Sequence, residues 1–320
     1  MRPDRTIWLF AAGYFAAYAP YSALIKLTSA RVSGLELLPG TIYGIVLAAL
    51  IYTFALGWWK HAGVPRRTIV VSGIGTAAII GTTTIAYTFH GISIVFALLL
   101  MRGGVLILAP LVDLAFGRRV RWFSWAALAL TFLALGVAFA DLDAKAFTTA
   151  AAINLGAYLS GYVLRLPAMT RVAKIADRDL TRTFFVRELM VALSALAAAP
   201  ALYAIFANGR AADELRRGFT LALPPAVLAA SLTIGVLYAS LYFFGTLIYL
   251  DRRENTFCIP LNRGASLLAG IAATVMIGGS PRPAELAGAS LVIGALLFLS
   301  PVHHLPEAWF ARIRKKELVR

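Results

Sequence analysis

The fold of this chain is indicated by the stretch Leu99–Leu106, which reads LLMRGGVL and places Arg102 inside a long apolar run. A second stretch, Pro260–Leu267, reads PLNRGASL and holds Arg263, 161 residues further along the chain. A charge at bilayer depth costs roughly 2.5–3.5 kcal/mol on insertion scales, so it is rare there without a function. Two arginines at matched positions therefore predict an internal repeat with a site between its halves.

The same offset of 161 residues pairs Gly117 with Gly278, so the repeat extends beyond the two arginines. Equivalent segments of the two copies run in opposite directions if each copy contains an odd number of spans. We therefore predict two inverted five-helix repeats, residues 1–140 and 141–302, followed by a basic cytoplasmic tail, residues 303–320.

The composition is that of a membrane protein. The chain has 320 residues, of which 60% are hydrophobic and 14% charged, and its mean hydropathy is +0.78. Soluble domains carry about 25% charged residues. Long apolar stretches recur from end to end, which predicts an all-α polytopic membrane protein with ten transmembrane helices.

The expected spans are about residues 6–29, 38–59, 67–89, 92–116, 122–140, 146–165, 182–207, 221–249, 255–278 and 284–301. The longer loops are expected at roughly 166–181 and 208–220.

The charges between the spans give an orientation. With the N-terminus in the cytoplasm, 19 lysines and arginines fall on the inner side and 6 on the outer side. This bias predicts that both termini are cytoplasmic, and it accounts for the net charge of +15 without a nucleic-acid partner. Arginine outnumbers lysine 24 to 6, which indicates a bacterial source and hence the inner membrane. Arg102 and Arg263 then both lie roughly 13–15 Å deep, near the bilayer midplane.

Several classes of chemistry are not indicated by the sequence. Cys258 is the single cysteine, and the four histidines do not have the spacing of metal ligands. No phosphate-binding, dinucleotide-binding or nucleophile-elbow motif occurs. We therefore expect no metal, no cofactor and no enzymatic activity.

A similar block of residues occurs in each half of the chain. In the first half the block contains Phe96–Arg102, Gly117–Arg119 and Trp125–Ala138, and in the second it extends from Ile259 to Leu299. These blocks resemble the drug/metabolite transporter superfamily, and within it the EamA-like or nucleotide-sugar-transporter-like branch. The chain departs from the family at Gly117-Arg118, where many members have Gly-Glu. The resemblance implies ten helices, cytoplasmic termini and alternating access around a central cavity, but it does not identify the cargo.

The predicted spans hold more cations than anions. The cations are Lys26, Arg102, Arg165, Arg187 and Arg263, against Asp113 and Glu188. Since an unpaired buried charge is costly, carbonyl groups, water or an anionic ligand must complete the set. We predict that Arg102 and Arg263, with Asn262 beside the latter, bind an anionic cargo through their planar guanidinium groups. An internal hydrogen-bonded clamp is the alternative. Lys26 is placed either in this site or at the interface by snorkelling, and Arg165 at the interface.

Tyrosines recur at helical spacing and form a second candidate set. They are suited to lining a polar cavity or to stacking on a ring-bearing cargo. We include Tyr18, Tyr21, Tyr158, Tyr162, Tyr238 and Tyr242 among the substrate-binding residues. Tyr14 recurs with Tyr18 and Tyr21 on the first expected span, and Tyr14 and Tyr249 belong either to this set or to interfacial belts.

These observations predict a secondary transporter. It would move an anionic metabolite, organic or phosphorylated and in one variant lipid-linked, by alternating access around a positively charged site. The expected partners are this small anion or lipid phosphate and the membrane lipids. Candidate groups for proton coupling are Glu188, Asp113 and His90. Two alternatives remain: an intramembrane enzyme acting on a phosphorylated lipid, and a membrane scaffold or sensor without transport activity.

Overall fold

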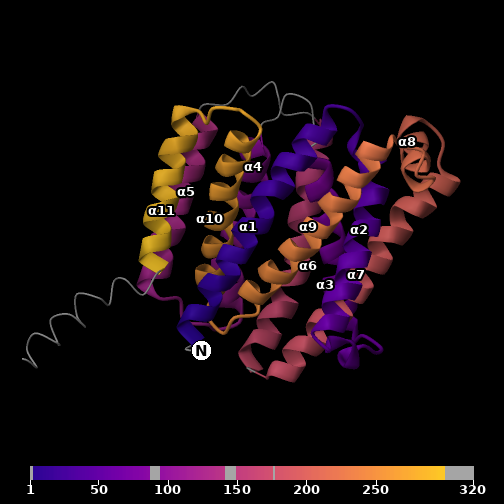
Figure 1. Ribbon diagram of the computed structural model, residues 1–320. Helices are drawn as coiled ribbons and strands as arrows, with labels where there is room; N and C mark the ends of the chain where they lie inside the picture. The colour runs from indigo at the N-terminus through magenta and orange to yellow at the C-terminus, as the bar shows by residue number, and fades with distance from the viewer. Residues whose placement is uncertain (1–2, 87–93, 141–148, 176, 300–320) are drawn as a thin grey trace, which may run out of the picture.

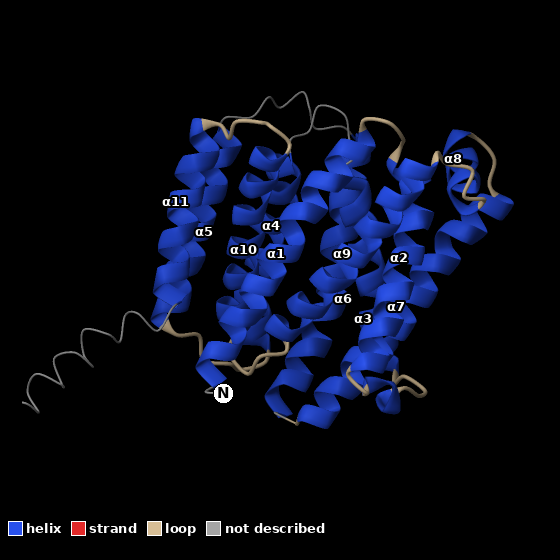
Figure 2. Cartoon of the chain, viewed as in Figure 1, coloured by secondary structure: helices blue, strands red, loops and turns tan. Residues whose placement is uncertain are grey.

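The chain folds into a bundle of helices (Figure 1). The computed structural model describes residues 3–86, 94–140, 149–175 and 177–299. All the regular secondary structure in these residues is helical, as Figure 2 shows. The helices are α1 (Pro3–Ser29), α2 (Gly34–Ala55), α3 (Arg67–Ala86), α4 (Ile94–Ala115), α5 (Trp122–Ala140), α6 (Thr149–Ile175), α7 (Arg178–Phe206), α8 (Arg210–Phe219), α9 (Pro225–Tyr249), α10 (Asn255–Met276) and α11 (Pro283–Leu299), with a short 3₁₀ helix η1 (Trp58–His61).

Ten of these helices fall where the apolar pattern predicts spans, and α8 does not. Residues 208–220 were expected to form a loop, but Arg210–Phe219 is helical. The buried residues Ala212, Leu215 and Gly218 recur every three positions, which gives α8 one narrow apolar stripe on an otherwise charged helix. A search for long apolar runs does not find such a helix. α6 also extends to Ile175, ten residues beyond its predicted end.

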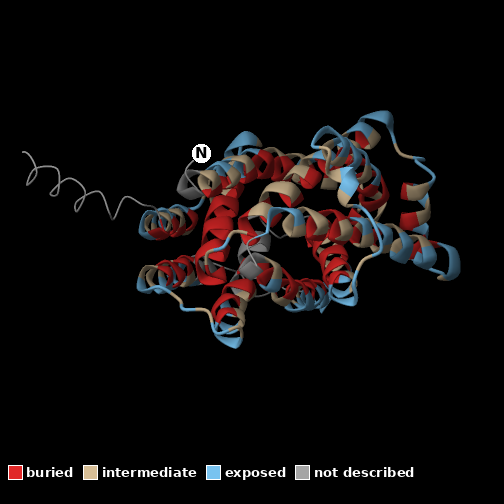
Figure 3. Cartoon of the chain, turned by 90° about the horizontal axis from the view of Figure 1, so that it is seen from below, coloured by how far each residue is buried: buried red, intermediate tan, exposed pale blue. Residues whose placement is uncertain are grey.

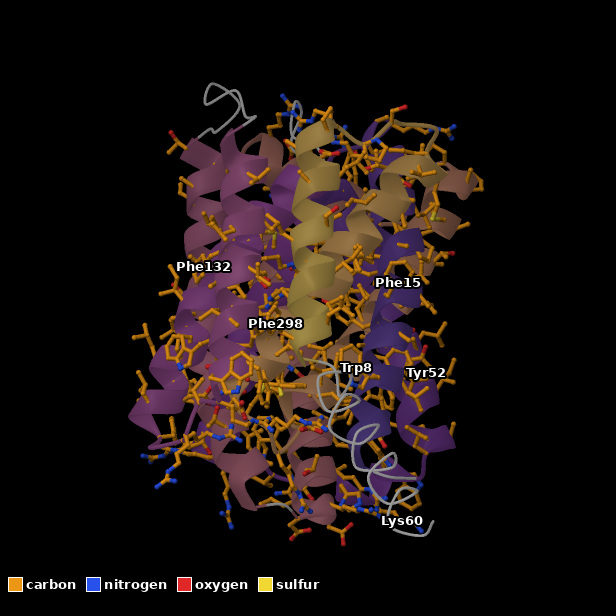
Figure 4. The ribbon with its side chains drawn as sticks, turned by 90° about the vertical axis from the view of Figure 1, so that its left-hand side faces the viewer. Trp8, Phe15, Tyr52, Lys60, Phe132 and Phe298 are labelled. Atoms are coloured by element: carbon orange, nitrogen blue, oxygen red, sulfur yellow. The ribbon has the colours of Figure 1, made fainter. Side chains whose placement is uncertain are left out.

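The described helices have the lengths and surfaces of a helical membrane protein. Five of them are long and apolar enough to cross a membrane, namely α2, α3, α7, α9 and α10. Large apolar side chains are exposed around the bundle; Phe54 and Phe206 are among the most exposed. Figure 3 shows buried residues on the inward faces of the helices. Figure 4 looks onto the flank that carries Phe132 and Phe298.

The helices pack in a regular set of pairs. α3 packs against α6, and α1 packs against α9. α2 packs against α9, and α3 against α7. α4 lies against α10, while α5 and α11 form one edge of the bundle (Figure 1). α8 lies against α2 and α7 at the opposite edge.

Glycines bring some of these helix backbones into direct contact. A Cβ on Gly75 would lie 2.6 Å from the carbonyl oxygen of Gly161, and a Cβ on Gly161 would lie 2.6 Å from that of Gly75. α3 and α6 therefore cross at a point where no side chain fits. Gly44 and Gly235 allow the same approach between α2 and α9. Small residues at such crossings let helices pack by van der Waals contact within a membrane.

Side chains from α4 and from the turn before α5 fix the start of α10. Asp113 accepts hydrogen bonds from the backbone N–H groups of Asn255 at 2.9 Å and Thr256 at 2.7 Å. It thereby satisfies two of the donors that a helix N-terminus leaves unpaired. Arg121 donates to both oxygens of Glu254, at 2.9 and 3.1 Å. These bonds join the two halves of the chain at the end of the bundle where α1 begins.

Candidate functional site

A cavity lies inside the bundle, bordered by α1, α3, α4, α6, α9 and α10. Its wall is rich in tyrosine, with Tyr14, Tyr18, Tyr162, Tyr238, Tyr242 and Tyr249. The other polar side chains on the wall are Thr76, Thr83, Arg102, Arg165, Thr246 and Asn262. The cavity is therefore rich in hydrogen-bond donors, although it lies in an apolar bundle.

Arg102 reaches the cavity wall from α4, and two tyrosines hold it there. It is 3% exposed. Its Nη1 donates to the hydroxyl of Tyr158 at 3.1 Å, and its Nη2 donates to the hydroxyl of Tyr18. Its guanidinium carbon also lies 5.2 Å from the centre of the Tyr18 ring, within the range of a cation–π contact. The hydroxyl groups of these two tyrosines thus orient the Arg102 guanidinium.

Arg165 was expected at the membrane interface, and the structure corrects this. It is 4% exposed and lines the cavity. Its Nε and Nη2 donate to the two carboxylate oxygens of Glu188, each at 3.0 Å, and Nη2 also donates to Thr246 at 2.7 Å. Because α6 continues ten residues past the predicted end, Arg165 lies well inside the helix rather than at its end.

Glu188 is fully buried and is surrounded by donors. Besides Arg165, its carboxylate accepts hydrogen bonds from the hydroxyls of Ser72, Thr76 and Tyr242. Such a set stabilises the ionised form. In this arrangement Glu188 serves as the counter-ion of Arg165; its predicted role in proton coupling stays a prediction.

Arg263 lies off the cavity wall, against the rings of two tyrosines that line it. It is completely buried. Its guanidinium carbon is 4.9 Å from the ring centre of Tyr162 and 5.9 Å from that of Tyr249. None of its three side-chain nitrogens has a hydrogen-bond partner among the described residues. Asn262, beside it, does reach the wall, and its Oδ1 accepts from the Tyr249 hydroxyl at 2.8 Å.

The structure brings most of the predicted tyrosines together. Tyr18, Tyr162, Tyr238 and Tyr242 line the cavity. Tyr21 and Tyr158 are buried behind them: Tyr21 packs on Tyr18 and Tyr238 with ring centres 5.6 and 5.4 Å apart, and Tyr158 packs on Tyr162 at 5.0 Å.

For Tyr14 and Tyr249 the sequence left the cavity and an interfacial belt both open, and the structure places both at the cavity. Both are buried and line the cavity. Tyr14 lies four residues before Tyr18 on α1, and Tyr249 lies seven after Tyr242 on α9. Helical spacing therefore places each on the same face as a tyrosine that was selected. That spacing was the signal available in the sequence.

The remaining predicted site residues lie elsewhere. Lys26 is partly buried near the end of α1 and is not among the residues that line the cavity. Asp113 is buried at the start of α10, where Asn255 and Thr256 donate to it. His90 lies outside the described residues. Within the described part of the chain, no group of three or more His, Cys, Asp or Glu side chains is placed to hold a metal ion.

Comparison with known proteins shows a shared fold. No family model matches the chain, and no curated protein sequence matches it. Solved structures do match, and one described only as "Crystal structure of protein" aligns with a TM-score of 0.66. The alignment covers 93% of this chain and 98% of the other, at 15% sequence identity. At this identity the likeness extends to the arrangement of the helices alone.

Proposed function

We propose that this protein is a secondary transporter of the drug/metabolite transporter superfamily that moves a small anionic metabolite by alternating access. Ten helices would cross the membrane, and the cargo would bind in the central cavity. The cargo is organic or phosphorylated, and its anionic group meets the positive charges that gather around the cavity.

The pattern of helix pairs supports two inverted repeats. In two such repeats α1, α2, α3, α4 and α5 correspond, in this order, to α6, α7, α9, α10 and α11. Replacing each helix by its counterpart turns the packed pair α3–α6 into α9–α1, which also packs. It also turns α2–α9 into α7–α3, and it leaves α4–α10 and α5–α11 unchanged. A pseudo-two-fold axis in the membrane plane would produce these equivalences. Residues 1–140 and 141–302 are then the two repeats, as the spacing of Arg102 and Arg263 predicts.

The arrangement of chain ends supports the proposed orientation. The start of α1, the turns before α3 and α7, and the turns after α4 and α9 lie at one end of the bundle (Figure 1). These segments carry basic residues, among them Arg66, Arg118, Arg178 and Arg252. Positive charge concentrates on the cytoplasmic side of membrane proteins. We therefore place this end in the cytoplasm of a bacterial cell, with the bundle in the inner membrane.

One observation supports a negative charge on the cargo: three buried guanidinium groups lie at or directly behind the wall of a single cavity. Arg102 and Arg165 lie on its wall, and Arg263 lies directly behind Tyr162 and Tyr249. Glu188 balances Arg165. Two tyrosine hydroxyls hold the Arg102 guanidinium at the wall, where a ligand in the cavity would meet it.

A second space favours the lipid-linked variant of the cargo. It is a recess between α2, α7 and α9, and its wall is mainly apolar, with Ala49, Phe185, Leu189 and Phe243. Tyr242 borders both this recess and the central cavity. The apolar wall would face the acyl chain of such a lipid, and the polar cavity its phosphate.

Counterflow in proteoliposomes tests the proposal. The purified protein is reconstituted and loaded in turn with organic acids, sugar phosphates and lipid phosphates, and exchange of labelled anion is measured. We expect exchange of at least one anion without chemical change, lost in Arg102→Ala and strongly reduced in Arg102→Lys. Arg31→Ala is the matched control, because Arg31 is exposed at the end of α1.

Three outcomes would contradict the proposal. Full exchange in Arg102→Ala would remove Arg102 from the site. Conversion of the labelled anion to a product would favour the enzyme. Absence of exchange with every anion would favour a scaffold or sensor.

A further inference from the structure

Arg263 is a buried cation whose donors have no acceptor. Its Nε, Nη1 and Nη2 all lack a hydrogen-bond partner among the described residues, and so does Nδ2 of the adjacent Asn262. The Arg263 side chain is also fully removed from solvent. A charge in this position is strongly unfavourable unless something supplies both acceptors and negative charge.

No buried carboxylate of the described residues supplies them. Each buried acid is already bound by donors other than Arg263. Asp113 is held by the start of α10, Glu188 by Arg165, Glu214 by Arg210, Glu254 by Arg121 and Glu285 by Arg282.

The two tyrosine rings meet only part of the requirement. Tyr162 and Tyr249 present their π-systems to the guanidinium, and cation–π attraction offsets some of the cost of burying the charge. A ring centre does not replace an in-plane acceptor for an N–H group, because guanidinium donors point outward in the plane of the fork. The N–H groups in the plane of the Arg263 guanidinium therefore still need acceptors.

We propose that Arg263 holds a resident small inorganic anion, a halide such as chloride, at a site distinct from the central cavity. A halide accepts hydrogen bonds from any direction, so it suits a fork of N–H groups, and its charge neutralises the arginine. Arg263 does not border the central cavity, so the ion would lie outside it. Water would supply acceptors and leave the charge uncompensated.

Bromide provides a direct probe, because its anomalous scattering identifies it. Crystals of the full-length protein would be soaked in sodium bromide. We expect an anomalous peak within hydrogen-bonding distance of the Arg263 guanidinium, present in Arg102→Gln and absent in Arg263→Gln. A wild-type crystal without this peak would overturn the proposal, whatever the variants do.

Thermal unfolding in detergent gives a second readout that needs no crystal. Wild-type protein would be compared in sodium chloride and in sodium gluconate at equal ionic strength. We expect chloride to raise the melting temperature of the wild type and of Arg102→Gln in a saturable way, and to leave Arg263→Gln unchanged. Equal stabilisation of wild type and Arg263→Gln would indicate a general salt effect and overturn the proposal. If Arg263→Gln does not fold, Arg263→Lys replaces it, and we expect a weaker chloride response from the loss of the fork.

These measurements are independent of transport. Failure of the counterflow assay would leave a bromide peak at Arg263 intact, and absence of the peak would leave the counterflow result intact. A transported organic anion that stabilises the protein through Arg263 while bromide does not would assign this arginine to the cargo and overturn the halide site.

Discussion

Arg165 and Glu188 are joined by two parallel hydrogen bonds of 3.0 Å, one from Nε to Oε1 and one from Nη2 to Oε2. Arg165 belongs to α6 and Glu188 to α7, and their other partners lie on α3 and α9. One buried ion pair therefore connects four helices, three from the second half of the chain and one from the first, at the wall of the cavity. Its planar two-bond geometry also fixes the orientation of Arg165.

Glu188→Gln should destabilise the protein strongly. The substitution leaves Arg165 buried without a charged partner, which typically costs about 3–5 kcal/mol. Thermal unfolding in detergent would measure it, with Asp179→Asn as the control, because Asp179 pairs with Arg182 on an exposed surface. That control should change stability by less than about 1 kcal/mol. The double variant Arg165→Met with Glu188→Met should recover most of the loss, and equal losses in Glu188→Gln and Asp179→Asn would contradict this reading.

Tyr158→Phe should weaken cargo binding. The hydroxyl of Tyr158 accepts from Nη1 of Arg102 at 3.1 Å, and its removal frees the guanidinium to rotate away from the cavity. A hydrogen bond to a charged group contributes about 1.5 kcal/mol, so we expect about a tenfold rise in the half-saturation concentration for counterflow. Tyr203→Phe is the matched control, because Tyr203 lies exposed near the end of α7. An unchanged half-saturation concentration in Tyr158→Phe would show that the tyrosine does not position Arg102.

Glu254 should make stability depend on pH. Burial alone would raise the pKa of this carboxyl in the turn before α10, but hydrogen bonds from Arg121 and Ser124 outweigh burial and hold the pKa below its ordinary value. The unfolded chain, whose glutamates titrate near pH about 4.3, therefore takes up the proton first. The stabilisation is complete above that pH and is lost as the pH falls through the lower folded-state pKa.

Glu254→Gln tests this dependence. We expect a loss of about 1 kcal/mol at pH 7, because Arg121 is half-exposed and its contribution is screened. The melting temperature of the variant should fall less steeply than that of the wild type between pH 5 and 3, as about one proton fewer is taken up on unfolding. Parallel curves for the two proteins would rule out Glu254 as a source of acid sensitivity.

The positions of the long helices could be predicted because apolar length is a strong signal. The position of each helix end could not be predicted in this way. Because α6 was expected to end near residue 165, Arg165 was placed at the interface and not at the cavity. Apolar periodicity stops near residue 165, whereas α6 continues to Ile175 through a segment with more charge and with Pro167 inside it. Hydrogen bonds and packing at the end of the bundle, not hydropathy, decide where this helix ends.

The sequence predicted which residues belong to the candidate site better than how these residues are arranged. The cost of a buried charge identified Arg102 and Arg263, but it does not say which of the two faces the cavity. That depends on how each helix is rotated about its axis, which neighbouring helices determine. The same limit applies to Tyr14, for which the sequence left the cavity and the interface both open although its side chain is buried.

Gly161→Ala should separate α3 from α6 and disturb the cavity. The added methyl group would lie 2.6 Å from the carbonyl oxygen of Gly75 and 2.8 Å from Cγ1 of Ile79, and a backbone oxygen cannot move aside as a flexible side chain can. Overpacking of this kind costs about 1–3 kcal/mol. Gly156→Ala is the control on the same helix: nothing lies within 4 Å of its added Cβ. There the better helix propensity of alanine should leave stability unchanged or raise it by about 0.5–1 kcal/mol.

Thermal unfolding of both variants measures the difference, and counterflow should be impaired in Gly161→Ala alone, since α3 and α6 carry Thr76 and Arg165 of the cavity wall. Equal behaviour of the two variants would mean that the helices can move apart without cost, and the backbone contact between Gly75 and Gly161 would then have no part in forming the site.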